Sequence, residues 1–269
     1  MKIKITHSTT YKYSSMVPRL VQCLKLYPSV CDNQEIIEWN TSSSCGKILE
    51  SHTDALGHRI QNIFINNFRG QLKITSKGIL KTKDLSGIVK GLKEKVNPLC
   101  FLRETDLTKP CKNIERISID AKKSNKNQIE FAHELNLIVS NSINYESGST
   151  TTSTSSKDAL MQKKGVCQDF AHILISVARF NQLPARYVNG FLLEETISGE
   201  NTTHAWVEIF INNLGWVAFD PSHKKCIDDK YIRISTGFDF EDASIIKGVK
   251  NNYNGNEYLN TKVDIENCQ

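Results

Sequence analysis

The sequence lacks the features that mark several large classes of protein. Its 269 residues include only 6 prolines and 14 glycines, which excludes collagen-like and proline-rich disordered chains. No stretch approaches the roughly 18 consecutive apolar residues of a membrane-spanning helix, so we expect no membrane segment. Lysines and arginines do not cluster in long runs, and the net charge is only +5, so we expect no nucleic-acid partner.

The cysteines also lack the spacing of a disulfide scaffold or a metal site. The eight cysteines are dispersed, and the chain contains no C-x-x-C pair, no H-E-x-x-H motif and no EF-hand loop. Disulfide frameworks belong mainly to short secreted chains, so we expect free thiols, a cytoplasmic location, and neither metal nor cofactor. The start of the chain, Met1–His7, alternates apolar and polar residues and predicts a strand rather than a signal peptide.

The chain does show a clear change of pattern near residue 85. Residues 1–85 alternate apolar and polar positions between turn signals, which predicts a β-rich, sandwich-like N-terminal domain. The strand candidates are Ile3/Ile5, Tyr11/Tyr13, Val21/Cys23/Leu24/Leu26, Ile36/Ile37/Trp39, Ile60/Ile63/Ile65 and Leu72/Ile74. Turns are expected at Asp54–Gly57 and Arg69–Gly70.

Residues 86–269 form the second predicted domain, in which helices precede antiparallel strands. Apolar residues at helical spacing predict helices over 127–143, 157–163 and from about 165 to before Pro184. Alternating apolar runs predict strands over 185–193, 203–211 and 215–219. Ser155 and Asp158 have capping-box spacing, the Ser/Thr-rich tract 148–156 predicts a flexible loop, and the polar tail from Gly248 is expected to be irregular. The fold class is therefore α+β.

Cys167 is the first residue that points to chemistry. It follows Gly165 at the start of a predicted helix, where the backbone N–H groups and the helix dipole would favour the thiolate form. The alternative is a small buried apolar side chain, which is what most free cysteines are. Position alone does not decide between a nucleophile and a core residue.

A cysteine nucleophile needs a base, and the chain offers seven histidines. His172 lies five residues further along the same helix and points about 140° away from Cys167. His7, His52 and His58 fall in the β-rich half, and His133 falls in a helix. His223 follows Pro221 in a lysine-rich turn. His204 remains as the candidate, on one face of a predicted strand with Trp206, Glu208 and Phe210.

Asp220 ends the strand that follows, and a predicted hairpin at 212–215 joins the two strands. In an antiparallel hairpin the start of the first strand lies beside the end of the second, so His204 and Asp220 are expected to meet. A carboxylate there would orient the imidazole and stabilise its protonated form. An ordinary turn carboxylate before Pro221 is the alternative.

These motifs, taken in order, resemble the core of the transglutaminase-like superfamily, and more narrowly its bacterial members of cysteine-protease type. The matching segments are Gly165–His172, Pro184–Gly190, Thr203–Phe210 and Gly215–Pro221. The upstream Tyr145-x-x-Gly148-x-Thr150 segment also fits those bacterial proteins. The first 80 or so residues, with Thr9–Tyr13 and Asp54-x-x-Gly57, resemble the β-rich domain that accompanies them.

The resemblance implies a papain-like core in which Cys167 is the nucleophile, His204 the base and then the acid, and Asp220 the residue that orients the histidine. It also implies a thioester intermediate on an amide substrate. The backbone N–H of Cys167 would meet the oxyanion, with Tyr145 as a candidate second donor. Trp206 either shields the ion pair from water or packs in the core. Arg186 and Asp169 are expected to form structural ion pairs.

Three functions remain open at this stage. The first is hydrolysis of peptide or isopeptide bonds, with a peptide or protein amide as the substrate and partner. The second is amide ligation or protein crosslinking, which uses the same three residues and differs only in accepting an amine instead of water. The third, from another class, is a non-catalytic binding or scaffold protein. Intact Cys167, His204 and Asp220 positions favour an enzyme, and the sequence leaves the oligomeric state open.

Overall fold

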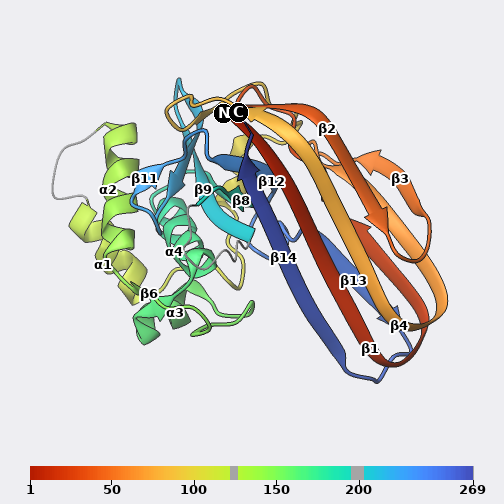
Figure 1. Ribbon diagram of the computed structural model, residues 1–269. Helices are drawn as coiled ribbons and strands as arrows, with labels where there is room; N and C mark the ends of the chain where they lie inside the picture. Colours follow the sequence, from red (N-terminus) through yellow and green to blue (C-terminus); the bar gives the residue numbers. More distant parts are fainter. Residues whose placement is uncertain (122–126, 195–202, 269) are drawn as a thin grey trace.

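The computed structural model describes residues 1–121, 127–194 and 203–268. The chain folds into a long β-sheet domain beside an α/β half, as the ribbon in Figure 1 shows. The strands are β1 Lys2–Leu24, β2 Gln34–Ser43, β3 Ile48–Thr53, β4 Arg59–Thr82, β5 Ile88–Val89, β6 Asn144–Tyr145, β7 Lys164–Gly165, β8 Ala185–Leu192, β9 Thr203–Ile211, β10 Gly215–Asp220, β11 Lys225–Cys226, β12 Tyr231–Gly237, β13 Ile246–Asn251 and β14 Glu257–Asn267. The helices are α1 Lys112–Ala121, α2 Gln128–Ser140, α3 Ser156–Gln162 and α4 Cys167–Phe180, with a 3-10 turn at Pro98–Leu102. The α+β class predicted from the sequence is confirmed.

The N-terminal sheet is built on two long strands, β1 and β4, which pair antiparallel along nearly their whole length. Each long strand uses different neighbours in its two halves. The first half of β1 pairs with β14 and its second half with β13, whereas β4 pairs first with β3 and then with β2. Apolar side chains from both halves of β1 and β4 share one core. Phe191 of β8 and Ile232 and Ile234 of β12 belong to the same core, so it lies between this sheet and strands of the second sheet.

The turn expected at Arg69–Gly70 is wrong. Strand β4 continues through these residues, and Gly70 takes a φ of 95°. The register between β1 and β4 shifts at this level, between Tyr13 and Val17. An extra residue in a strand bends it locally and strengthens its twist. The glycine therefore marks an irregularity inside one bent strand, while the other predicted turn, Asp54–Gly57, is confirmed by the Asp54 N–H to His58 carbonyl hydrogen bond of 3.0 Å.

The expectation of an irregular C-terminal tail is also wrong. Strand β14 pairs with β1 from Ile3 opposite Asn267 to Tyr13 opposite Glu257, so the two ends of the chain lie side by side (Figure 1). Only Val263 and Ile265 of this strand are buried. A strand at a sheet edge can be held by its backbone hydrogen bonds, so its side chains need not alternate between apolar and polar. The mostly polar sequence of β14 therefore gave no strand pattern to predict from.

The second sheet has the order β11-β10-β9-β8-β12, with β5 added on β10. The three strands expected from the sequence are confirmed to within a residue or so at their ends. Helix α4 packs on one face of the sheet, against Ala205, Val207 and Ile209 of β9. The opposite face carries Trp206 and Trp216, which pack with Val188, Tyr231 and residues from the segments that precede α1. Each face of β9 is therefore buried, as its sequence pattern required.

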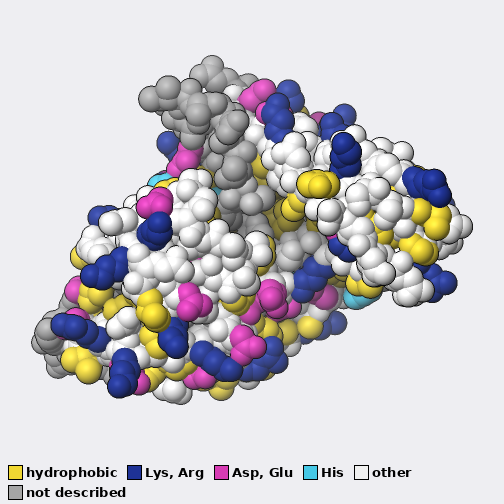
Figure 2. Space-filling model, turned by 90° about the horizontal axis from the view of Figure 1, so that it is seen from below, with side chains coloured by type: hydrophobic (Ala, Val, Ile, Leu, Met, Phe, Trp, Pro, Cys, Tyr) yellow, Lys and Arg dark blue, Asp and Glu magenta, His cyan; other side chains and the backbone are white. Residues whose placement is uncertain are grey.

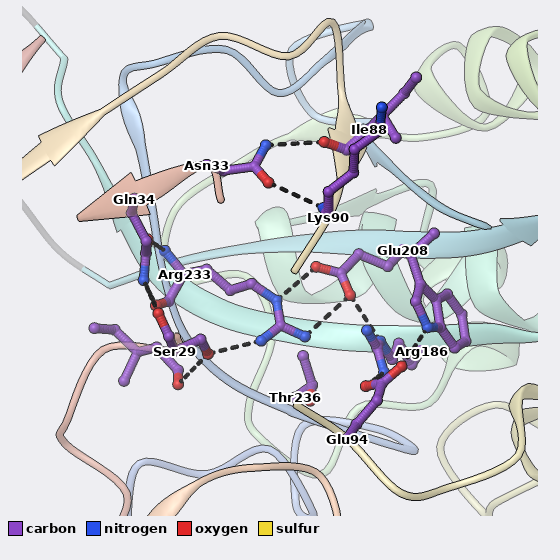
Figure 3. A network of polar contacts seen from close by, with 12 residues as sticks. Ser29, Asn33, Gln34, Ile88, Lys90, Glu94, Arg186, Glu208, Arg233 and Thr236 are labelled. Atoms are coloured by element: carbon purple, nitrogen blue, oxygen red, sulfur yellow. Dashed lines mark hydrogen bonds and ion pairs between the residues drawn. The ribbon is translucent and has the colours of Figure 1, made fainter. Parts of the chain in front are cut away.

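A buried charge network ties the sheet to the segments before it (Figure 3). Glu208 of β9 accepts hydrogen bonds from the Nε atoms of Arg186 and Arg233, both at 2.7 Å. Arg233 also donates to Ser29 Oγ at 2.7 Å, and its backbone N–H donates to Gln34. Ser29 and Gln34 belong to the connection between β1 and β2. The network therefore joins the N-terminal sheet to the core of the second half.

The outer surface shows no single-sign field on the face drawn in Figure 2, where acidic and basic side chains alternate. Across residues 1–121, 127–194 and 203–268, no helix is both long and apolar enough to span a membrane.

Candidate active site

Cys167 is the first residue of α4, with a free and partly exposed thiol. The short parallel pair β6–β7 leads directly into this helix. Val166 precedes it in an extended conformation and has no polar side chain to cap the helix. The carboxylate of Asp169 supplies the cap instead, because its Oδ2 accepts the Val166 N–H at 2.8 Å. The thiol is thus held at the positive end of a well-formed helix.

The structure corrects the role expected for Asp169. This carboxylate is buried and makes no ion pair with a described residue; it accepts hydrogen bonds from Val166 N–H and, at 2.6 Å, from Thr150 Oγ1. Arg186 does form the structural ion pairs that the sequence predicted, with Glu208 and Glu94. The difference arises because Asp169 lies in the first turn of α4, where unpaired backbone N–H groups attract a carboxylate.

The Ser/Thr-rich tract 148–156 was expected to be a flexible loop, and in the structure it makes specific contacts. Thr150 binds Asp169, and the Thr151 N–H donates to Thr154 Oγ1 at 3.0 Å. Ser155 caps α3 and forms the predicted capping box with Asp158. The hydroxyl groups replace the backbone hydrogen bonds that a turn lacks. The tract therefore anchors the segment in front of Cys167.

The predicted proximity of His204 and Asp220 is confirmed. His204 lies on β9 and Asp220 at the end of β10, and these antiparallel strands bring His204 Nε2 to 2.6 Å from Asp220 Oδ2. The Asp220 side chain is fully buried, and that of His204 is 11% exposed. Cys167 acts on the same imidazole, because its side chain also raises the pKa of His204. A hydrogen bond therefore joins His204 to Asp220, and the effect of Cys167 on the His204 pKa places the thiol near the same ring.

The electrostatics of the His204–Asp220 pair favour separated charges. Burial disfavours the His204 imidazolium, but the hydrogen bonds and negative charges of Asp220 and Cys167 outweigh it and raise the pKa of His204 to about 10. Burial likewise opposes charge on Asp220, yet hydrogen bonds from His204 and His223 hold its pKa well below the usual range.

Three residues around Asp220 were not assigned to the site from the sequence. Tyr231 donates its hydroxyl to Asp220 Oδ2 at 2.8 Å, and Ser222 donates both its N–H and its hydroxyl to Oδ1. His223 places Nδ1 2.9 Å from Oδ2, although its lysine-rich context suggested only a surface turn. The Asp-Pro-Ser-His spacing could have indicated the two local residues, since an aspartate commonly accepts N–H groups two and three positions later. Tyr231 comes from another strand, β12, and no sequence pattern near Asp220 indicated it.

The structure also places Trp206 and Tyr145, the two aromatic residues that the sequence associated with the site. Trp206 is fully buried, and its ring lies alongside that of His204, with ring centroids 6.3 Å apart. Trp206 therefore packs in the core, which is one of the two alternatives expected for it, and its shielding of the ion pair from water stays a prediction. Tyr145 is 61% exposed and stacks on Phe170 of α4. Burial raises the pKa of Tyr145, and the nearby charges of Cys167, Glu194 and Asp220 raise it further, so its hydroxyl keeps a proton to donate.

His204, Asp220 and His223 are also the described residues whose donor atoms come close enough to contact one cation, within 4.8 Å of one another. Each pair that includes Asp220 is already within hydrogen-bond distance. Hydrogen bonding therefore accounts for the cluster. The sequence expectation of no metal and no cofactor stays a prediction.

Comparison with known proteins identifies the class that this fold and site define. Residues 116–221 match the transglutaminase-like superfamily, and residues 3–81 match the bacterial transglutaminase-like N-terminal region. The chain thus consists of a transglutaminase-like core preceded by a bacterial transglutaminase-like N-terminal region, as its motifs predicted.

Individual proteins from three bacteria are similar to this chain. A candidate cysteine protease from Cytophaga hutchinsonii has a similar structure, with a TM-score of 0.77 at 22% identity over 99% of this chain and 90% of that one. An uncharacterized protein of Mycobacterium leprae is 26% identical over 98% of both chains. One from Mycobacterium tuberculosis is 31% identical over 147 residues, 51% of this chain and 47% of that protein. The matched part therefore spans about half the length of the M. tuberculosis relative.

Alkylation by iodoacetamide is expected to single out Cys167 at low pH. Because the thiol faces a protonated imidazole at a helix N-terminus, Cys167 should react at pH 6, where ordinary thiols are almost fully protonated and react slowly. His204→Ala should slow this reaction by about tenfold or more, since the positive partner is lost. Mass spectrometry at each cysteine measures both rates. Equal rates at Cys167 and at the exposed Cys100 would contradict the ion pair.

Proposed function

We propose that the protein catalyses acyl transfer from amide bonds through a thioester on Cys167, and that its main reaction is hydrolysis of peptide or isopeptide bonds. One observation carries the proposal: the His204 imidazole is hydrogen-bonded to the buried Asp220 carboxylate, and the Cys167 side chain at the start of α4 raises the pKa of the same imidazole. A nucleophile, a base in contact with it, and a third group that orients the base are the parts that covalent acyl transfer requires.

In the first step the Cys167 thiolate attacks the amide carbonyl, and a carbon–sulfur bond forms. The carbon–nitrogen bond then breaks as His204 gives its proton to the departing amine, which leaves a thioester and a neutral imidazole. In the second step His204 takes a proton from water, the hydroxide attacks the thioester, and the thiolate is released. The backbone N–H of Cys167 and the Tyr145 hydroxyl are the proposed donors to the oxyanion.

Hydrolysis is favoured over crosslinking by the name of the similar Cytophaga hutchinsonii protein, a candidate cysteine protease. Transfer to an amine is the alternative, because the same thioester is attacked by whichever nucleophile reaches it. A purely binding role is disfavoured by the buried carboxylate. A buried charge costs free energy, and Asp220 here serves chiefly to hold two imidazoles, a hydroxyl and a turn.

The test separates the two products of the thioester. The protein is incubated with an unfolded protein substrate, with and without a fluorescent primary amine. We expect new N-termini or a released side-chain amine, and at most minor amine incorporation. Protein that has been alkylated at Cys167 is the control and should form neither product. Amine incorporation with ammonia release, and no cleavage, would replace hydrolysis by the transglutaminase reaction; no product together with no trapped thioester would favour the binding role.

A further inference from the structure

Asp220 serves two imidazoles rather than one. His223 Nδ1 lies 2.9 Å from Asp220 Oδ2, the same oxygen that His204 Nε2 contacts at 2.6 Å. The rings of His204 and His223 approach edge to face, with centroids 5.2 Å apart. The backbone N–H of His223 also donates to Asp220, at 3.2 Å to Oδ1. The position of the buried carboxylate therefore depends on His223 as well as on His204.

The second ring nitrogen of His223 also faces a carboxylate. His223 Nε2 lies 2.5 Å from Glu194 Oε1, next to the C-terminal end of β8. An ionised carboxylate only accepts hydrogen bonds, and a neutral imidazole has a single N–H. With a carboxylate at each nitrogen, only the doubly protonated ring donates to both. The contact geometry thus selects the charged form of His223.

We propose that His223 is a positioning residue for the Cys167–His204–Asp220 site, held as an imidazolium between Asp220 and Glu194. This proposal deepens the proposed function and rests on it for the catalytic roles of those three residues. The hydrogen bond to Asp220 raises the pKa of His223, more than its partial burial and the charge of His204 lower it. His223 acts through Asp220 and does not itself touch the thiol.

The groups around His223 determine how its positive charge affects the His204 imidazolium. Asp220 and Glu194 attract it, His204 repels it, and the Tyr231 hydroxyl competes for the same Asp220 oxygen. The neighbouring Lys224 and Lys225 are bound elsewhere, to Asn141 and Asp228. Because two positive rings share one carboxylate, His223 offsets part of the stabilisation that Asp220 gives to the His204 imidazolium. A base with a pKa nearer the working pH is the more effective catalyst.

The charge of His223 can be measured without any substrate. In the full chain, the His223 ring signal is followed by NMR through a pH titration and identified by its loss in His223→Asn. We expect wild-type His223 to stay protonated at pH 7. Glu194→Gln should lower the titration midpoint of His223 by about one pH unit. The amide NH2 group can donate a hydrogen bond to an unprotonated Nε2, so the neutral ring is no longer disfavoured there. A wild-type midpoint at or below the ordinary 6.5 would overturn the proposal.

The positioning role is tested by the pH profile of Cys167 alkylation. His223→Asn keeps an N–H donor for Asp220 but removes the positive charge, so Asp220 stabilises the His204 imidazolium more strongly. The step of the profile at which His204 loses its proton should therefore move to higher pH by about one unit. His133→Asn, at an exposed histidine of α2, is the matched control and should leave the profile unchanged. An unshifted profile in His223→Asn would overturn the positioning role.

Two further readouts separate this role from damage to the fold and from failure of the proposed function. Thermal unfolding of His223→Asn should match that of the wild type within a few degrees, so a large loss of stability without a profile shift would mean a structural role. Neither the NMR titration nor alkylation requires amide turnover. If no amide substrate is ever turned over while both readouts behave as expected, the proposed function fails and the His223 assignment stands.

Discussion

Cys167→Ala is expected to lose amide turnover by on the order of 10⁴-fold or more, because no other group can form the thioester. The structure explains why a different cysteine cannot substitute. Cys167, at the start of α4, is the cysteine whose side chain raises the pKa of His204. The pKa of Cys226, by contrast, is raised to about 11 by burial, so this thiol stays protonated at neutral pH. The measurement is kcat/KM on the best substrate found in the cleavage assay.

Cys100→Ala provides the matched control for this experiment. Cys100 is free and exposed, and it lies in the 3-10 turn at Pro98–Leu102, outside the site. We expect unchanged turnover in this variant. Turnover that survives in Cys167→Ala, with the thermal stability of both variants equal to that of the wild type, would show that the reaction does not pass through a Cys167 thioester.

Glu208→Gln is expected to lower the free energy of unfolding by about 3–5 kcal/mol, the usual cost of breaking a buried ion pair. Glu208 is fully buried between Arg186 and Arg233 (Figure 3). Burial opposes its charge, but the two arginines outweigh this and lower its pKa to about 2. A neutral amide offers one acceptor oxygen to the two arginines, and its NH2 group faces the other guanidinium without accepting a hydrogen bond. Urea unfolding followed by circular dichroism measures the change.

The pH dependence of stability gives the same residue a second test. A carboxyl whose pKa is lowered by folding, here from 4.5 to about 2, stabilises the fold above pH 4.5 and loses that contribution as the pH falls toward 2. The stability lost by wild type in this acid range should therefore be smaller in Glu208→Gln. Asp106→Asn, which removes an exposed ion pair with Lys109, should leave the urea midpoint unchanged. Equal midpoints for Glu208→Gln and wild type would contradict the network's role.

Local patterns made the second half of the chain predictable. The strands 203–211 and 215–219 are joined by a short hairpin, so their antiparallel pairing needs no information from elsewhere. That pairing alone places His204 beside Asp220. Cys167 was equally accessible, because an apolar repeat with helical spacing starts immediately after it. The sequence therefore predicts the site residues whose positions depend only on their own helix or hairpin.

The surroundings of the site could not be read in this way. Tyr231 reaches Asp220 from a strand on the far side of the sheet order, and Glu194 reaches His223 from the end of β8. Arg186 and Glu208 are adjacent across the β8–β9 register. Glu94, which pairs with Arg186, and Ser29, which accepts a hydrogen bond from Arg233, come from loops that carry no pattern. These contacts depend on how sheets, loops and helices pack together, a property of the whole chain.

The sequence by itself determined the α+β class, the helix that presents Cys167 and the hairpin that joins His204 to Asp220, because hydrophobic period and turn chemistry act over a few residues. Only the tertiary structure decided that β14 returns to pair with β1 and that His223 joins the site. It also showed that one buried glutamate serves two arginines. Backbone pairing at a sheet edge and charge pairing across layers bring together residues far apart in sequence, and such contacts leave no local periodicity.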